Sequence, residues 1–178
     1  MAGSHRDLSD WDSFRCQMPV TEKWVYFDHA AVSPLSEPAR KVIVDWAQQA
    51  ANEGGACWLQ WSQQVEEVRK KLAKLIGASW EEVALVRNTT SGIGLVADGF
   101  DWQQGDNVVL PAGEFPSNLY PWMNLATRGV EARRVEMEPG QLDLDRLAAA
   151  CDRRTRIISV SWVGYADGWR SDVSQLAK

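Results

Sequence analysis

The polar side chains best suited to binding an anion gather at one junction in this sequence, where an apolar run gives way to a helical pattern. The stretch RNTTSGIG occupies residues 87–94, directly after the apolar run VALV. Three consecutive hydroxyl side chains stand at the expected start of the helix: Thr89, Thr90 and Ser91. The first N–H groups of a helix lack intrahelical partners and carry the positive end of its dipole, and glycines let a ligand approach the backbone. We therefore predict a phosphate-binding site here, although a threonine acting only as an N-cap would give the same pattern.

The spacing of the glycines argues against a nucleotide-binding version of such a site. The stretch SGIGLVADG does not fit the pattern G-x-G-x-x-G, and the sequence has no G-K-[ST] for a P-loop. Asp101 follows the turn too closely to be the acidic residue that holds a ribose. Dinucleotide binding is therefore disfavoured.

Composition and charge limit the kinds of molecule that we expect this protein to bind. The chain has 178 residues, with 24 acidic and 19 basic side chains, and its net charge of -5 argues against nucleic acid. The first thirty residues contain no long apolar run, so we predict no signal peptide, no transmembrane helix and no membrane partner. Cys16, Cys57 and Cys151 are far apart and lack metal-ligand spacing, which predicts no metal site and favours reduced thiols in the cytoplasm.

Apolar periodicity predicts a strand and two helices ahead of the junction. Residues 23–28 are typical of a short strand. A helix follows the N-cap Ser36, with Pro38 in its first turn and Gly54 at its end. Its expected buried stripe consists of Val42, Ile43, Trp46, Ala47 and Ala50. A second amphipathic helix covers residues 59–78, and its apolar face is formed by Trp61, Val65, Val68, Leu72 and Leu75.

From residue 82 onward, short apolar runs alternate with helical segments. The expected strands cover residues 82–86, 107–111, 130–136 and 156–163, and the expected helices cover residues 90–99, 117–127 and 142–151. Strands separated by helices of this length imply crossover connections, so we predict an α/β fold with a mostly parallel sheet flanked by helices. A sheet of this kind that ended at Lys178 would leave edge strands uncovered. We therefore divide the chain into an N-terminal arm, a strand with two helices, and an incomplete α/β domain, which span residues 1–22, 23–80 and 81–178.

Four segments resemble, in their order and approximate spacing, enzymes of the class V aminotransferase fold. They read YFDHAAVSPLS, LVRNTTSGI, GDNVVLPAGEFPSNLYPW and IISVSWVGYADGWRSDV. This family consists of pyridoxal-phosphate enzymes of fold type I and includes cysteine desulfurases, kynureninase and isopenicillin-epimerase-like proteins. The resemblance covers residues 24–178 and implies the N-terminal part of the large cofactor-binding domain. It also implies that the anion is the phosphate of pyridoxal 5'-phosphate, held by Thr89, Thr90, Ser91 and adjacent backbone amides.

The resemblance implies roles for three further residues. Phe115 matches the aromatic ring that stacks on the cofactor's pyridine ring, and a core phenylalanine at a strand end is the alternative. Many relatives carry histidine there, and phenylalanine stacks but transfers no proton. Trp162 matches the asparagine that bonds the ring hydroxyl in many desulfurases, and its indole N–H donates but cannot accept. His29 would line the substrate pocket, or would make only local hydrogen bonds in its turn.

The resemblance also implies that some of the family's residues lie beyond Lys178. These are the Schiff-base lysine, the aspartate that faces the pyridinium nitrogen, and the arginine that binds the substrate carboxylate. We therefore expect the chain alone to be inactive and to be the N-terminal part of an enzyme that transforms an amino acid. A non-catalytic remnant or interaction protein and an unrelated phosphate-binding α/β domain are the alternatives.

The type of reaction and the assembly are also expectations from the resemblance. A desulfurase, lyase, epimerase or aminotransferase reaction all fit, and the segment EFPSN favours the epimerase-like branch. Family members are commonly homodimers, and exposed tryptophans such as Trp58 and Trp61 would serve such an interface, with packing in the core as the alternative.

Overall fold

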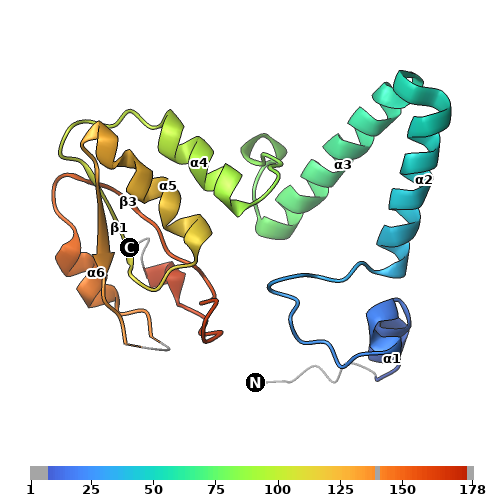
Figure 1. The fold of residues 1–178 in the computed structure, drawn as a ribbon, viewed down its shortest axis with the longest axis horizontal. Coiled ribbons are helices and arrows are strands. Elements are labelled where there is room, and N and C mark those ends of the chain that lie inside the picture. The colour runs from blue at the N-terminus through green and yellow to red at the C-terminus, as the bar shows by residue number, and fades with distance from the viewer. Residues whose placement is uncertain (1–7, 139–140, 176–178) are drawn as a thin grey trace. The chain divides into compact units, whose positions relative to one another are not determined.

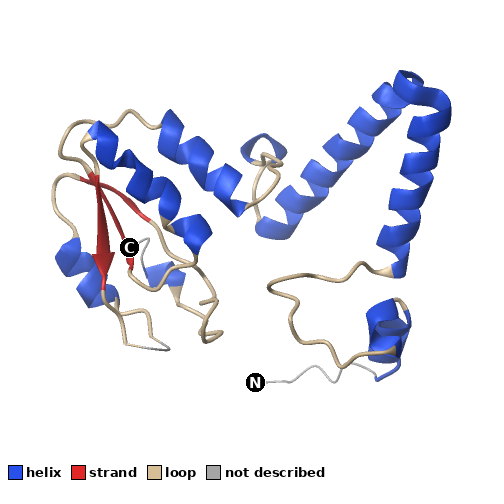
Figure 2. Cartoon of the chain, in the orientation of Figure 1, coloured by secondary structure: helices blue, strands red, loops and turns tan. Residues whose placement is uncertain are grey.

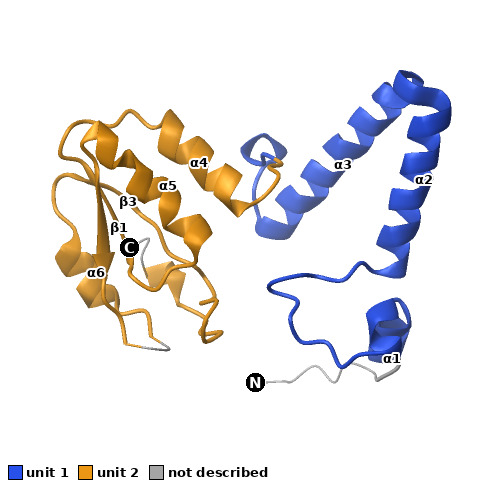
Figure 3. Cartoon of the chain, viewed as in Figure 1, with its two compact units in different colours: residues 1–84 blue, residues 85–178 orange. Residues whose placement is uncertain are grey.

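The computed structural model describes residues 8–138 and 141–175, and the chain divides into two compact units between Ala84 and Leu85 (Figure 3). Helices make up most of the first unit, whereas the strands all lie in the second (Figure 2). We call them the N-terminal unit and the C-terminal unit and describe each by itself. The expected domain boundaries at residues 22 and 80 remain predictions.

The described residues of the N-terminal unit form three α-helices, α1 (Leu8–Cys16), α2 (Glu37–Glu53) and α3 (Trp58–Ile76) (Figure 1). The ends of α2 confirm the sequence prediction, because the hydroxyl of Ser36 accepts a hydrogen bond from the Ala39 N–H at 3.4 Å. Gly54 ends α2 with a φ of 56°, and Gly77 ends α3 with a φ of 71°. Glycine adopts a positive φ without the steric cost of a Cβ, and at Gly77 the conformation is left-handed helical.

Polar and aromatic contacts join α2 to α3. The indole N–H of Trp61 donates to the side-chain oxygen of Gln49 at 2.9 Å, and the rings of Trp46 and Trp61 lie 6.1 Å apart. At the end of α3, Arg69 donates to the carbonyl groups of Val83 and Trp80, which fixes the turn that follows the helix. Trp61 therefore packs within the unit.

Two expectations for the N-terminal unit are wrong. Residues 24–28 form no strand, and Val25 and Phe27 are 80% and 89% exposed. A strand needs a partner for its backbone N–H and C=O groups, and no described segment pairs with these residues. The expected buried stripe of α2 is also largely solvent-exposed, since Val42 and Trp46 are 66% and 53% exposed.

The C-terminal unit is built on a parallel sheet, as predicted. Strand β1 (Asn107–Pro111) lies between β2 (Glu131–Val135) and β3 (Thr155–Ile158), and both pairings are parallel. Residues 82–86, expected to be a further strand, form none among the described residues. The helices are α4 (Thr89–Gly99), α5 (Tyr120–Met123) and α6 (Leu144–Ala150). The expectation of one helix over residues 117–127 is wrong, because only α5 is α-helical there and 3-10 turns lie on both sides of it.

Burial of β1 on both faces organises this unit. Val108 and Leu110 pack in one cluster with residues of α4 and α5, including Ala97 and Trp122. Val109 is equally buried and points to the other face, because side chains alternate along a strand. Helix α6 lies on that side and contacts β1 and β2, with Leu147 fully buried (Figure 1). The unit is therefore a layered α/β fold, as the sequence predicts.

A polar network joins the amino ends of the strands. The side chain of Asn107 donates to Asp152 at 3.0 Å and accepts from the Thr155 hydroxyl at 2.8 Å. Arg133 donates to the second oxygen of Asp152 at 2.7 Å. The hydrogen bond from Arg133, followed by that from Asn107, lowers the pKa of Asp152 to about 2.

We expect Asp152 to make the stability of the C-terminal unit sensitive to acid. Its pKa is lower in the folded chain than the ordinary value of 3.8, so its stabilisation is complete above about pH 4 and is lost as the pH falls toward about 2. Urea unfolding followed by circular dichroism across this range should show a smaller pH dependence in Asp152→Asn than in the parent chain. Asp145→Asn, at an exposed carboxylate on α6, is the matched control. Identical pH profiles for Asp152→Asn and the parent would contradict the assignment.

Candidate functional site

Helix α4 begins at the hydroxyl-rich junction, and its N-cap is an asparagine. The side-chain oxygen of Asn88 accepts a hydrogen bond from the Ser91 N–H at 2.8 Å, and the Asn88 carbonyl accepts from the Gly92 N–H. The interpretation of a threonine as the N-cap is therefore wrong. Among the described residues, the N–H groups of Thr89 and Thr90 have no acceptor.

The first turn of α4 is joined to the segment that follows β1. The hydroxyl of Thr90, in the first turn of α4, donates to the hydroxyl of Ser117, in the 3-10 turn that follows β1, at 2.9 Å. Two free amides, the hydroxyls of Thr89 and Thr90, and the positive end of α4 are donors that suit a phosphate group. This donor set fits the phosphate of the cofactor that the sequence resemblance implies.

The glycines of the junction are not required by packing within the described chain. A Cβ at Gly94 would meet no atom within 4 Å, and one at Gly92 would meet only a methyl group of Val86 at 3.4 Å. The surface at this turn is therefore open enough for a ligand to approach the backbone closely, and the approach itself stays a prediction.

Phe115 follows β1 and is half-exposed, with 48% of its surface accessible. Its ring meets the ring of Tyr165 edge-on, with centroids 5.1 Å apart and planes at 76°. The alternative interpretation of Phe115 as a core residue is therefore wrong. An exposed ring after a parallel strand is available for stacking, and the role of Phe115 toward the cofactor stays a prediction.

Trp162 follows β3 at the start of a tight turn. Its carbonyl accepts from the Ser171 N–H at 2.8 Å, and Val163 pairs with Arg170 in the antiparallel sense. The expected strand over residues 156–163 therefore ends early, at Ile158, because the chain beyond it pairs with itself. The Trp162 side chain is 62% exposed.

Hydrogen bonds between two pairs of side chains join the segment after β1 to the segment after β3, and sequence reasoning missed both pairs. The carboxylate of Glu114 accepts from both the N–H and the hydroxyl of Ser161, each at 2.6 Å. The side-chain oxygen of Asn118 accepts from the Ser159 hydroxyl at 2.5 Å and from the buried Trp122 indole at 3.1 Å. The glutamate and asparagine of GEFPSN and the alternating serines of SVS were the available signals.

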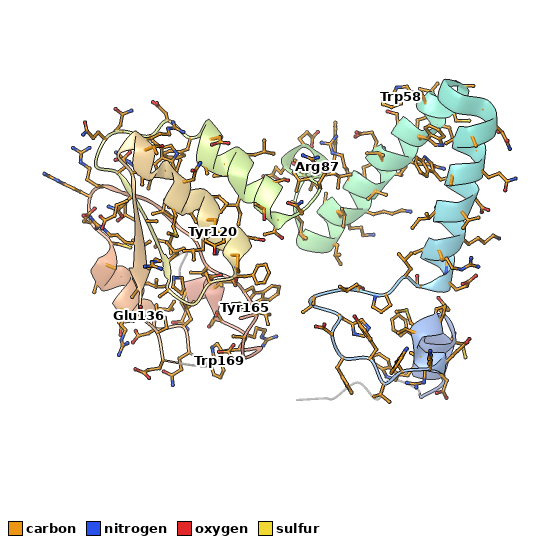
Figure 4. The ribbon with its side chains drawn as sticks, in the orientation of Figure 1. Trp58, Arg87, Tyr120, Glu136, Tyr165 and Trp169 are labelled. Carbon is orange, nitrogen blue, oxygen red and sulfur yellow. The ribbon has the colours of Figure 1, made fainter. Side chains whose placement is uncertain are left out.

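A cavity of about 420 Å³ lies beyond the carboxyl ends of β1 and β2. Among the residues that line it are Pro111, Glu114, Glu136, Ser161, Tyr165 and Trp169. Of these, Glu136, Tyr165 and Trp169 are labelled in Figure 4. The described lining includes none of the five residues expected to contact the cofactor. It does include Glu114 and Ser161, each of which directly precedes one of those five. Ligands of open α/β sheets bind beyond the carboxyl ends of the strands, which is this edge.

His29 belongs to the N-terminal unit and lies in a turn. Its ring meets that of Tyr26 edge-on at 5.0 Å, and the Tyr26 hydroxyl donates to the Val32 carbonyl at 2.6 Å. These contacts are local to the turn, and the role of His29 toward a substrate remains a prediction.

The described residues offer neither a membrane span nor a metal-binding cluster. No described helix is both long and apolar enough to cross a bilayer. No group of three or more His, Cys, Asp or Glu side chains among the described residues is arranged to hold a metal ion.

Comparison with known proteins decides the family. The family model for aminotransferase class-V matches residues 25–178, which is most of the chain. The chain belongs to this family. A probable cysteine desulfurase of Methanothermobacter thermautotrophicus is 32% identical over 172 residues, an alignment that covers 94% of this chain. The hypothesis of an unrelated phosphate-binding domain is therefore wrong.

Solved structures agree with this class V aminotransferase fold. A cysteine desulfurase from Thermococcus onnurineus is 27% identical and superposes over 98% of this chain with a TM-score of 0.75. A mutant of C-DES, which carries glycine covalently linked to its PLP cofactor, superposes over 92% with a TM-score of 0.84 and 23% identity. The chain spans less than half the length of these proteins, namely 43% of the Methanothermobacter relative and 44–45% of the two structures.

We expect the start of α4 to depend on the asparagine cap. Asn88→Ala should lower the free energy of unfolding by about 1 kcal/mol, because the Ser91 N–H loses its acceptor. Asn88→Ser restores an oxygen that can accept this bond and should recover most of the loss, as measured by urea unfolding. If the alanine variant were as stable as the serine variant, the cap would contribute nothing.

Proposed function

We propose that this chain forms the part of a class V aminotransferase-like enzyme that binds the phosphate of pyridoxal 5'-phosphate. The substrate class is an amino acid. One observation carries the proposal, namely the open amino end of α4. There, the N–H groups of Thr89 and Thr90 have no acceptor among the described residues, and the two hydroxyl groups lie in the same turn.

The electrostatics of this helix end favour a phosphate dianion. The amides at the start of α4 and the helix dipole direct positive charge to one point. The Thr90 hydroxyl, which now donates to Ser117, can turn to the phosphate and leave Ser117 as a second donor. Ser91 lies in the same turn, with its N–H held by the cap and its hydroxyl available.

The cofactor's ring would lie between side chains that follow β1 and β3. When bound, pyridoxal phosphate acts as an electron sink that stabilises negative charge at the substrate carbon. Phe115 would orient the ring by stacking and would exclude water from one face, and Trp162 would donate its indole N–H at the ring's edge. Neither side chain carries a titrating proton at neutral pH, so a general base must come from elsewhere.

The reaction type is left open among desulfurase, lyase, epimerase and aminotransferase chemistry. The names of the relatives favour a cysteine desulfurase, whereas Phe115 in EFPSN favours the epimerase-like branch. His29 would contact the amino-acid substrate. We place the protein in the cytoplasm, in keeping with its three free cysteines.

Binding of pyridoxamine 5'-phosphate to the full chain tests the proposal, because this amine form cannot condense with surface lysines. Thr90→Val keeps the shape of the side chain but removes the hydroxyl, and it should weaken binding about ten-fold in calorimetry. Thr127→Val, at an exposed threonine after α5, is the matched control and should bind like the parent. Equal affinities for the parent and the Thr90→Val chain, or no binding by either, would remove the basis of the proposal.

We also expect homodimers, because the N-terminal unit exposes large apolar side chains. Trp58 is 72% exposed and Leu59 is 69% exposed at the start of α3. Burial of such residues between two copies would remove apolar area from water. Sedimentation velocity should show a dimer whose dissociation constant rises at least ten-fold in Trp58→Glu, with Lys70→Glu on the exposed face of α3 as the control. A monomer at all concentrations would contradict the expectation.

A further inference from the structure

The strongest unexplained feature of the C-terminal unit is a buried carboxylate. Glu114 is only 8% exposed, and both of its oxygens accept short hydrogen bonds from Ser161, one from the backbone and one from the hydroxyl. No basic side chain among the described residues forms an ion pair with it. Burial of a carboxylate costs free energy unless its oxygens are hydrogen-bonded. A contact that served only to hold two loops together would therefore cost less free energy if apolar side chains made it.

The positions of Glu114 and Ser161 in the sequence suggest what their two hydrogen bonds do. Glu114 directly precedes Phe115, and Ser161 directly precedes Trp162. The bond therefore holds together the two loops that carry the side chains assigned to the two contacts with the cofactor ring. Phe115 also meets Tyr165 across the same two loops, so its ring direction depends on their separation.

We propose that Glu114 is a positioning residue that sets the distance and orientation between Phe115 and Trp162 for the cofactor's ring. The inference rests on the proposed function, since it assumes that these two side chains contact the ring. Glu114 acts through the loops and touches neither the phosphate site nor, by this assignment, the reacting atoms. Its paired bonds to one serine fix both the spacing and the rotation of the joint, which a single bond would leave free.

This role predicts different effects on the binding of two parts of the ligand, the phosphate group and the pyridine ring. The phosphate is bound at the start of α4, whose Thr90 is joined to Ser117 rather than to Glu114. Loss of the Glu114 bonds should therefore weaken binding of the pyridine ring and leave binding of the phosphate group unchanged. A residue that merely keeps the unit folded would weaken both to the same extent.

The experiment compares two ligands on the full chain and four variants. Glu114→Leu removes both bonds, Ser161→Ala removes only the hydroxyl bond, and Glu114→Gln keeps an oxygen for the Ser161 N–H and an amide that can donate to the Ser161 hydroxyl. Glu131→Leu is the matched control, because Glu131 is an exposed glutamate of the same unit that does not line the cavity. Binding of pyridoxamine 5'-phosphate is measured by calorimetry, binding of inorganic phosphate by competition, and the orientation of the ring by the circular dichroism of its absorption band.

We expect Glu114→Leu to weaken pyridoxamine 5'-phosphate about ten-fold, to leave inorganic phosphate unchanged and to reduce the circular dichroism of the bound ring. Ser161→Ala should fall between this variant and the parent, and Glu114→Gln and Glu131→Leu should match the parent within about two-fold. Equal weakening of both ligands by Glu114→Leu, or no change in either, would overturn the inference but not the proposed function. If Glu114→Leu fails to fold, Ser161→Ala decides by the same comparison. Failure of the parent chain to bind either ligand would overturn the proposed function and this inference together.

Discussion

Burial of the central strand β1 on both faces is the constraint on which the rest of the C-terminal unit depends. A strand whose backbone is paired on both sides and whose side chains are all buried needs helices above and below, and crossover helices make its neighbours parallel. The order β2-β1-β3 therefore gathers all three carboxyl ends at one edge. The loops that carry Glu114 and Ser161, although 47 positions apart in the chain, meet there because the strands beneath them are paired.

The two ends of this sheet are held by polar groups of different kinds. At the amino ends, Asn107, Asp152 and Arg133 form a network with an opposite charge for the carboxylate, and this lowers the pKa of Asp152. At the carboxyl ends, Glu114 is bonded by the neutral donors of Ser161. The charged network secures the fold where no ligand is expected, whereas the neutral joint lies between the two loops of the candidate site.

The N-terminal unit shows that helix formation and burial are decided separately. Ser36, Gly54 and Gly77 act on the backbone nearest to them, so the limits of α2 and α3 follow from local signals. Burial of the apolar stripe of α2 requires a surface to cover it, and the described residues of this unit provide one only around Trp61. In the proposed homodimer, the exposed stripe that carries Val42 and Trp46, together with Trp58, is the apolar area that the interface would bury.

The sequence by itself determined the family, the parallel α/β class, the positions of α2, α3, α4 and α6 and the hydroxyl-rich start of α4, because these depend on local propensity, periodicity and motifs in order. It did not identify Asn88 as the cap, since three hydroxyl residues and an asparagine compete at that point and only the backbone conformation at residue 88 selects one. Residues 23–28 and 82–86 have the composition of strands, yet a strand exists only where another segment supplies hydrogen bonds. Only the tertiary structure brought Glu114 to Ser161, because that contact depends on the register of two strands distant in sequence.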